Sequence, residues 1–244
     1  MRNYEQEVQK RVEFIRARLA DSGARGIVLG ASGGKDSALT AILCKRACEN
    51  VLGVIMPCDS AVNLNEDMTD ALAVAKKYDI EHITVDLTSM KLDLCGKAEA
   101  AGESLNTAAV INIAPRLRMT ALYLLAHCRQ SLVAGTGNRS ELYMSYFTKW
   151  GDGACDFNPI ADLTVREVYE FLEYLDAPVS IIKKAPSAGL FAGQTDEQEL
   201  GISYVVIDEY LLRGESAEKN VVVIEKAHRA GAHKRSMPIF YKGE

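Results

Sequence analysis

The chain has 244 residues, of which 48% are hydrophobic and 25% are charged, and these proportions exclude a largely disordered protein. Its formal net charge is −5, and an acidic chain is a poor match for nucleic-acid backbones, so we expect no nucleic-acid partner. No apolar run reaches membrane-spanning length, and the N-terminus does not resemble a signal peptide. We therefore expect no membrane association.

The six cysteines include no C-x-x-C pair, and most of them lie in apolar surroundings. This usage indicates a reduced protein in the cytoplasm rather than a disulfide framework. Cys44 and Cys48 would share a helix face, but no second pair of ligands accompanies them. A zinc site is therefore not expected.

The first half of the sequence alternates between helical and strand patterns. Apolar residues at helical spacing predict a first helix that includes Val8 and Leu19 and ends at Asp21-Ser22-Gly23. Buried strands are predicted at 26–30, 51–56, 82–86 and 131–135. Helices are predicted at 36–48 and 65–78, and a long helical stretch covers 105–130, where Pro115 should break or kink it.

This alternation predicts an α/β fold, with a doubly wound parallel sheet and helices on both of its faces. Ligands of such sheets bind beyond the carboxyl ends of the strands. Three loops are expected at that edge, at residues 31–36, 57–61 and 136–141.

Beyond Glu141 the periodic pattern weakens, and 144–159 are predicted to form a loop. Thr164, with Glu167 three residues later, has the spacing of a capping box and begins a helix that runs to about Leu175. Residues 185–199 combine proline, glycine and polar side chains, so we expect a mobile lid that ATP orders. Helices are predicted at 203–212 and 216–230, and a short strand at 238–241. No repeat or linker divides the sequence, so we expect one domain over 1–244.

The strongest local signal is Gly30-Ala31-Ser32-Gly33-Gly34-Lys35-Asp36-Ser37, between the first strand and the second helix. Adjacent glycines let backbone N–H groups approach an anion, and the helix N-terminus offers further donors to it. Asp36 would repel a bare phosphate, so we expect Mg²⁺ to lie between them. Neither the Walker pattern nor the dinucleotide fingerprint is present. A glycine-rich turn with Asp36 as a helix cap is the alternative interpretation.

The segment Ser32 to Ser37 resembles the pyrophosphate-binding loop of N-type ATP pyrophosphatases, which cleave ATP between its α- and β-phosphates and adenylate a substrate oxygen. Further motifs narrow the resemblance: Gly135-Thr136-Gly137-Asn138 with Glu141, then 147–153, 185–190, 194–204 and 233–235. In this order and spacing, over about residues 25–238, they resemble the ammonia-dependent NAD synthetases.

The resemblance implies ATP-dependent amidation of nicotinate adenine dinucleotide (deamido-NAD) by ammonia, which gives NAD, AMP and pyrophosphate through an acyl adenylate. This is the last step of NAD biosynthesis. The implied cofactor is Mg²⁺, the implied substrates are ATP, deamido-NAD and ammonia, and the implied assembly is a homodimer with an interface near Pro115. A glutamine-dependent form would need an additional amidase domain, for which we expect no room in a chain of this length.

The resemblance also assigns roles to single residues. The ATP-binding residues are Gly30, Ala31, Ser32, Gly33, Gly34, Lys35, Asp36, Ser37, Thr136 and Ser187. The Mg²⁺ ligands are Asp36 and Glu141. The deamido-NAD-binding residues are Arg116, Lys149, Asp156, His233 and Lys234. Asp156 is also our candidate catalytic residue, which orients ammonia or accepts a proton from ammonium.

Several of these residues also fit structural roles. Asp156 could cap a loop, Lys149 could pair with Trp150 at the surface, and His233-Lys234 could be the basic end of a helix. Relatives carry an ATP-contacting lysine where this chain has Val165, and many carry arginine at Ile55. Both departures reduce the positive charge near the triphosphate, and Lys35 or Arg166 is the candidate to restore it.

Two other functions are compatible with the pyrophosphate-binding loop. One is a different amide-forming or thiolating pyrophosphatase, which acts on XMP or on tRNA. The tRNA function predicts paired cysteines and a basic surface, and this sequence has neither. The other is a non-catalytic nucleotide sensor built on the same sheet.

Overall fold

The computed structural model describes residues 2–59, 64–184 and 196–243. Its four strands are β1 (Gly26–Gly30), β2 (Val51–Ile55), β3 (Glu81–Thr84) and β4 (Ser131–Val133). They form one sheet in the order β3-β2-β1-β4, and every pair of neighbours is parallel. The strand order changes direction at β1, so β1 and β4 flank the switch point where such sheets bind ligands.

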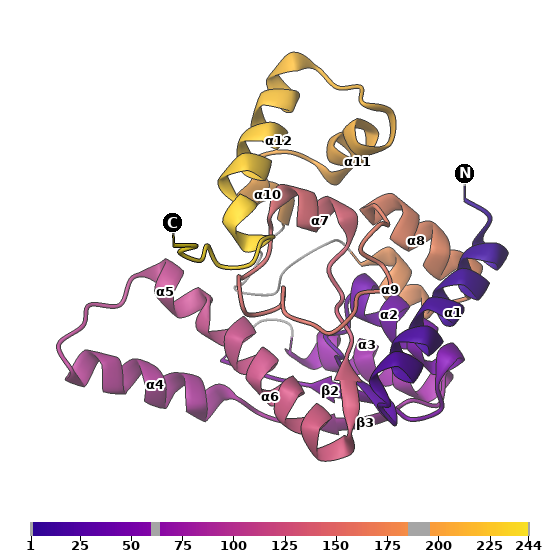
Figure 1. Cartoon of the computed structure of the whole chain (residues 1–244), viewed down its shortest axis with the longest axis horizontal. Coiled ribbons are helices and arrows are strands. Elements are labelled where there is room, and N and C mark those ends of the chain that lie inside the picture. Colours follow the sequence, from indigo (N-terminus) through magenta and orange to yellow (C-terminus); the bar gives the residue numbers. More distant parts are fainter. Residues whose placement is uncertain (1, 60–63, 185–195, 244) are drawn as a thin grey trace.

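The described helices cover both faces of this sheet and build the C-terminal part that stands beyond it (Figure 1). They are α1 (Tyr4–Ser22), α2 (Lys35–Ala47), α3 (Leu64–Lys77), α4 (Thr88–Ala100), α5 (Thr107–Ile111), α6 (Ile113–Arg129), α7 (Arg139–Met144), α8 (Val165–Tyr174), α9 (Val179–Lys183), α10 (Asp196–Leu200), α11 (Tyr204–Arg213), α12 (Glu218–Ala230) and the 3₁₀ helix η1 (Ala232–Lys234). None of the helices within the described ranges is long and apolar enough to cross a membrane.

Alternate residues of β1 face opposite layers, as the pleat requires. Ile27 and Leu29 join a core formed with α1, α2 and α8. Val28 joins a second core on the other face, formed largely with α6. A third apolar cluster, which includes Val165 and Tyr204, packs α7, α8, α11 and α12 together. The predicted α/β fold with a doubly wound parallel sheet is confirmed.

Most predicted elements agree with the structure to within two residues. The first helix ends at Ser22, where Gly23 adopts a left-handed φ of +68°. The capping box of Thr164 and Glu167 begins α8, as predicted. The long helical stretch does break, but it breaks at Asn112, between α5 and α6. Pro115 lies in the first turn of α6, where a helix needs no N–H donor, so it causes no kink there.

The structure contradicts the predicted strand at 238–241 and contains helices that were not predicted. Residues 238–241 form no strand, because no described residue pairs with them, and Ile239 is fully exposed. Helix α4 was not predicted, and helix α7 replaces the end of the expected 136–141 loop. The lid at 185–199 stays a prediction. Its last residues, from Asp196, belong to helix α10. Its remainder, residues 185–195 with Ser187, lies outside the described residues.

Candidate active site

The predicted phosphate loop connects the carboxyl end of β1 to the start of α2. Its sharp turn requires glycine at position 33, where φ is +75° and a Cβ atom would lie 2.1 Å from the backbone oxygen of Asp67. Two serines hold the turn, since Ser37 Oγ donates to the Gly34 carbonyl at 3.0 Å and lies 3.0 Å from Ser32 Oγ. Gly34 places no capping side chain over the first N–H groups of α2. The loop therefore presents helix donors to an anion.

The two predicted Mg²⁺ ligands come from different helices and meet at one ammonium group. Asp36 lies in the first turn of α2, and Glu141 in the first turn of α7. Lys35 Nζ donates to Asp36 Oδ2 at 2.7 Å and lies 3.7 Å from Glu141 Oε1. The structure thus brings Lys35, Asp36 and Glu141 together beside the phosphate loop.

Asn138 fixes both carboxylates in this arrangement. Its side chain donates to Asp36 Oδ1 at 3.0 Å and accepts from the backbone N–H of Glu141 at 3.0 Å. Glu141 Oε2 in turn accepts from the backbone N–H of Asn138 at 3.2 Å, which completes a capping box at the start of α7. Sequence reasoning from the motif Gly135-Thr136-Gly137-Asn138 assigns Asn138 no role. The signal for this cap is the Asn-x-x-Glu spacing after a buried strand.

One ammonium group faces two carboxylates in this cluster. Burial alone would lower the pKa of the Lys35 ammonium, but the carboxylates of Asp36 and Glu141 raise it, so Lys35 remains charged. Burial and the negative charge of Asp36 raise the pKa of Glu141 to about 8, against the opposing effect of Lys35. Ionisation of Glu141 is therefore unfavourable while Lys35 alone faces the two carboxylates, and a further positive charge at the site would favour the ionised form.

Two carboxylates beside a phosphate loop fit Mg²⁺. This ion prefers oxygen ligands, and it commonly takes one or two carboxylates and completes its shell with water and phosphate oxygens. Within the described ranges, no group of three His, Cys, Asp or Glu side chains is placed to hold a metal by itself. The donor set is therefore that of a metal–nucleotide site rather than of a closed protein cage.

The two departures from the family pattern are both apolar in the structure. Val165 is buried in the third apolar cluster, which also contains Tyr204, and Ile55 is buried at the end of β2. Arg166 does not replace the missing lysine at the site, because its Nε donates to Glu170 at 2.8 Å on the exposed side of α8. Lys35 is the candidate that lies in the site.

Three predicted substrate residues gather around the loop at 145–153. Arg116 Nε donates weakly to the Lys149 carbonyl at 3.4 Å. Lys149 Nζ lies 5.4 Å from the ring of Trp150, which is the surface pair considered above. Lys234 Nζ donates to the carbonyls of Ser145 and Phe147 at 2.9 and 2.7 Å. His233 is exposed next to it on η1.

Asp156 lies at the edge of β4. Its Oδ2 accepts from the Val133 N–H at 2.7 Å, and its Oδ1 accepts from the Tyr123 hydroxyl at 3.2 Å. These contacts give Asp156 the loop-capping role, and none of its hydrogen bonds joins it to Asp36 or Glu141. Its catalytic role stays a prediction. Thr136 is half-buried in the segment that follows β4, the strand that pairs with β1.

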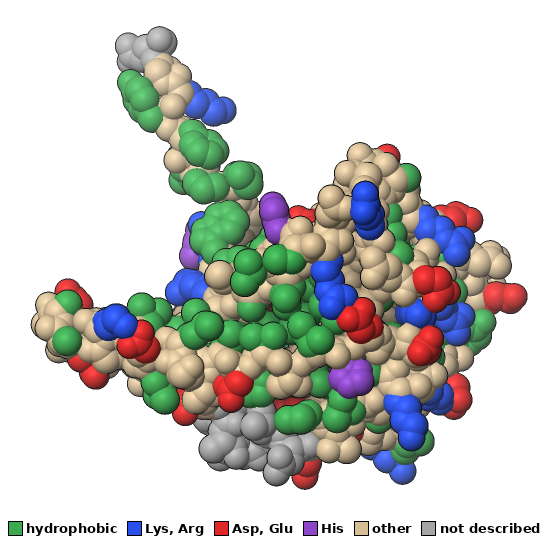
Figure 2. All heavy atoms as spheres, turned by 90° about the horizontal axis from the view of Figure 1, so that it is seen from below, with side chains coloured by type: hydrophobic (Ala, Val, Ile, Leu, Met, Phe, Trp, Pro, Cys, Tyr) green, Lys and Arg blue, Asp and Glu red, His purple; other side chains and the backbone are tan. Residues whose placement is uncertain are grey.

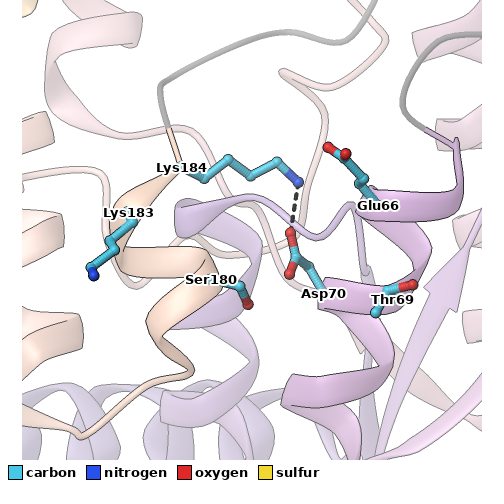
Figure 3. Close-up of a pocket in the computed structure, with 6 residues that line it drawn as sticks. All are labelled: Glu66, Thr69, Asp70, Ser180, Lys183 and Lys184. Atoms are coloured by element: carbon cyan, nitrogen blue, oxygen red, sulfur yellow. Dashed lines mark hydrogen bonds and ion pairs between the residues drawn. The ribbon is translucent and has the colours of Figure 1, made fainter.

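A cavity of about 440 Å³ lies between α3 and α9, and Figure 3 shows the six residues that line it, Glu66, Thr69, Asp70, Ser180, Lys183 and Lys184. Lys184 Nζ donates to Asp67 Oδ1 at 2.6 Å and to Asp70 Oδ2 at 2.8 Å. Since the backbone of Asp67 also contacts Gly33, this ion pair ties the end of α9 to the helix that supports the phosphate loop.

The family model described as NAD synthase matches residues 7–238 of this chain. The NH3-dependent NAD(+) synthetase of Carboxydothermus hydrogenoformans is 45% identical over 238 residues, which cover 97% of each chain. The corresponding synthetase of Archaeoglobus fulgidus is 42% identical and covers 97% of this chain and 96% of its own. The chain belongs to the NAD synthase family. Its activity is the NH3-dependent conversion of deamido-NAD to NAD, an ATP-using ligase reaction of NAD biosynthesis.

Solved structures agree with the family assignment. The NMN synthetase of Francisella tularensis superposes with a TM-score of 0.93 and 34% identity, and all of both chains is covered. The NH3-dependent NAD synthetase of Campylobacter jejuni superposes with a TM-score of 0.81 and 32% identity, over 99% of this chain and all of its own. Membership of the NAD synthase family excludes the tRNA and sensor alternatives that the phosphate loop alone left open.

Proposed function

We propose that the loop at 30–37 binds the phosphates of ATP and that Asp36 and Glu141 hold the accompanying Mg²⁺ while the carboxylate of deamido-NAD is adenylated. The convergence of Asp36 and Glu141, from two helices, on one edge of the phosphate loop carries this proposal. The loop and α7 follow β1 and β4, so the site lies at the switch point of the sheet.

The reaction requires an activated carboxylate, because a free carboxylate repels nucleophiles and has no good leaving group. Its oxygen attacks the α-phosphorus of ATP, pyrophosphate leaves, and ammonia then displaces AMP from the acyl adenylate. When bound, Mg²⁺ would neutralise charge on the departing pyrophosphate. The chain itself contributes the N–H groups of the loop, the hydroxyls of Ser32 and Ser37, and the ammonium of Lys35, which orient the phosphates.

We propose that the loop at 145–153 and the basic residues around it receive deamido-NAD. Arg116 and Lys149 offer charges to the phosphates of this anionic dinucleotide, and His233 lies exposed nearby on η1. Lys234 shapes the loop through its two carbonyl contacts. Burial lowers the pKa of Lys234, and the charge of Asp152 partly offsets this effect. Asp156 remains our candidate for positioning ammonia.

The proposed site of action is the cytoplasm, and the proposed assembly is a homodimer. All six cysteines are free thiols, as a reducing compartment requires. Helices α4 and α6 expose hydrophobic side chains, some of which are visible in Figure 2. Met90, Leu92, Leu94 and Leu124 on these helices are each 49% to 63% exposed. Met90 and Leu94 share one side of α4, and Leu92 lies on the other. Exposed apolar side chains gathered on two neighbouring helices are typical of a protein interface.

A second substrate is supported by one observation. The structure that superposes with a TM-score of 0.93 over the whole of both chains is an NMN synthetase, whereas the synthetase of C. jejuni superposes with 0.81. Nicotinate mononucleotide carries the same carboxylate as deamido-NAD but lacks its adenylate half. We propose it as an additional substrate of the same site.

The test is a product assay with purified chain, ATP, Mg²⁺ and ammonium chloride, in which deamido-NAD and nicotinate mononucleotide are supplied in separate reactions. Chromatography should show AMP and pyrophosphate formed together with NAD or NMN. We expect efficient NAD formation and measurable NMN formation. Absence of NMN would exclude the second substrate only. Absence of both amides with intact ATP would contradict the proposed site.

A further inference from the structure

Lys35 has a position that the proposed chemistry does not explain. Its ammonium is buried, donates to Asp36 and lies 3.7 Å from Glu141, so it contacts both proposed Mg²⁺ ligands. A metal ion between these carboxylates would need the same oxygen atoms. Lys35 Nζ also lies 5.9 Å from the centre of the Tyr204 ring, a second favourable contact for a cation. An ammonium and a divalent ion cannot both occupy this place.

We propose that Lys35 is an exchangeable counter-ion of the site. Its ammonium lies against Asp36 and Glu141, and on binding of Mg²⁺ and ATP it would turn to the phosphate oxygens. This inference rests on the proposed function, because it assumes that Asp36 and Glu141 hold Mg²⁺ and that the loop holds ATP.

The covalent structure of Lys35 allows this exchange. A lysine carries a compact charge with three donors on a flexible four-carbon stem, so its ammonium can move while its backbone stays fixed. Lys35 is the first residue of α2, and the N–H groups of that turn face the proposed phosphates. An ammonium that leaves the carboxylates therefore remains within the anion site and is not exposed to solvent alone.

The counter-ion role makes two opposite predictions for one substitution. In Lys35→Met the carboxylates lose their competitor, so the nucleotide-free chain should bind a divalent cation more tightly, by about tenfold. The same variant should bind ATP with Mg²⁺ more weakly, by about tenfold, because the phosphates lose a charge. If Lys35 only stabilised the fold, its loss would not tighten cation binding while weakening ATP binding.

Val165 offers a position from which the charge can be restored. Val165 lies on α8 and packs in the apolar cluster that includes Tyr204. The ring of Tyr204 also faces the ammonium of Lys35. The side chain of a lysine at position 165 would therefore start close to the proposed ATP site. The double variant Lys35→Met/Val165→Lys should regain at least half of the ATP affinity that Lys35→Met loses, measured with Mg²⁺ and compared as log Kd.

The experiment measures Mn²⁺ binding by electron paramagnetic resonance without nucleotide, and ATP binding by calorimetry with Mg²⁺. Lys45→Met, at the other end of α2, is the matched control and should behave as wild type. Lys35→Arg keeps a positive charge beside the carboxylates and should bind Mn²⁺ more weakly than Lys35→Met does. Circular dichroism checks that each variant is folded, and a misfolded Lys35→Met is replaced by Lys35→Gln.

Two results would overturn the inference. If folded Lys35→Met or Lys35→Gln binds Mn²⁺ no more tightly than wild type, or ATP no more weakly, Lys35 is not exchangeable, and the proposed function still stands. If wild type binds no Mn²⁺ even when ATP is present, both the counter-ion role and the proposed magnesium site are wrong.

Discussion

Asn138 joins the two halves of the proposed metal site with a single side chain. Its amide nitrogen reaches Asp36 on α2, and its amide oxygen caps α7, where Glu141 begins the helix. Because the amide can donate and accept at once, it serves both elements without adding charge. A carboxylate in its place could cap α7 but could not donate to Asp36.

We expect Asn138→Ala to lose activity as well as stability. Loss of the N-cap should cost about 1 kcal/mol in the free energy of unfolding. Activity should fall by about tenfold or more, since Asp36 and Glu141 lose their common support. The matched control is Asn106→Ala, which removes the N-cap of α5. Urea unfolding should show a stability loss in both variants, and the NAD assay should show a large activity loss in Asn138→Ala alone. If the two variants are equally active, Asn138 only caps α7 and does not support the two carboxylates.

The carboxylates themselves are tested by Asp36→Asn and Glu141→Gln. Each replacement keeps the shape of the side chain but removes one negative ligand, so the remaining carboxylate would hold Mg²⁺ alone. We expect product formation to fall by at least about a hundredfold, with circular dichroism unchanged. Asp93→Asn on the exposed α4 is the control. Turnover like that of wild type at low Mg²⁺ would remove the substituted residue from the site.

The sequence predicts residues of the site that are adjacent along the chain better than partnerships across it. The loop 30–37 is recognisable because its glycines, serines and Asp36 lie within eight positions. The contacts of Asn138 with Asp36 and of Lys35 with Glu141 depend on how α2 and α7 approach each other. No periodicity encodes that distance, so these two roles became visible only in the folded chain.

At the scale of elements, burial explains which helices were predictable. Strands β1 and β2 are buried along their length, and their short apolar runs predicted them to within one residue. Helix α4 has no buried residue within its 13, so it lacks the apolar stripe that periodicity detects. The apolar residues at 238–241 suggested a strand, but a strand also needs a partner, which sequence patterns do not supply.

An ion-pair network ties α1 to the loop before α8. Arg11 Nη1 lies 2.7 Å from Asp162 Oδ1, and Arg2 Nε donates to Glu167 at 2.7 Å. Burial alone would raise the pKa of Asp162, but its hydrogen bond with Arg11 and the charges of Arg11 and Arg2 lower it. A carboxyl whose pKa is lower in the folded chain stabilises that chain above the unfolded pKa.

We therefore expect Asp162→Asn to destabilise the chain at neutral pH and to have no effect in acid. The loss should be about 1 kcal/mol at pH 7, since solvent screens this half-exposed pair. It should remain complete down to about pH 4 and vanish as the pH falls through the lowered native pKa. Urea unfolding at several pH values measures it. The control is Asp21→Asn, which removes an exposed partner of Arg18 on the same helix. A loss that is independent of pH would indicate a packing effect.

At the scale of the whole molecule, the nitrogen source follows from the family. The chain matches NH3-dependent synthetases along almost the entire length of both sequences. We expect ammonium chloride to support NAD formation and glutamine freed of ammonia to give none. Addition of a separate glutaminase should restore activity with glutamine, because it releases ammonia. Efficient use of purified glutamine by this chain alone would contradict the assignment.

The last prediction concerns the exposed apolar side chains of α4 and α6. Leu92 and Leu124 leave large apolar surfaces in water, which is costly for a monomer, and a second copy would cover them. We expect light scattering after gel filtration to show a dimer. Leu92→Glu/Leu124→Glu should shift it toward the monomer, because each charge would be buried at the interface without a partner. The control is Val179→Glu on α9, an apolar residue that is about as exposed but lies outside these two helices. If the double variant stays a dimer and Val179→Glu becomes a monomer, the interface does not lie on α4 and α6.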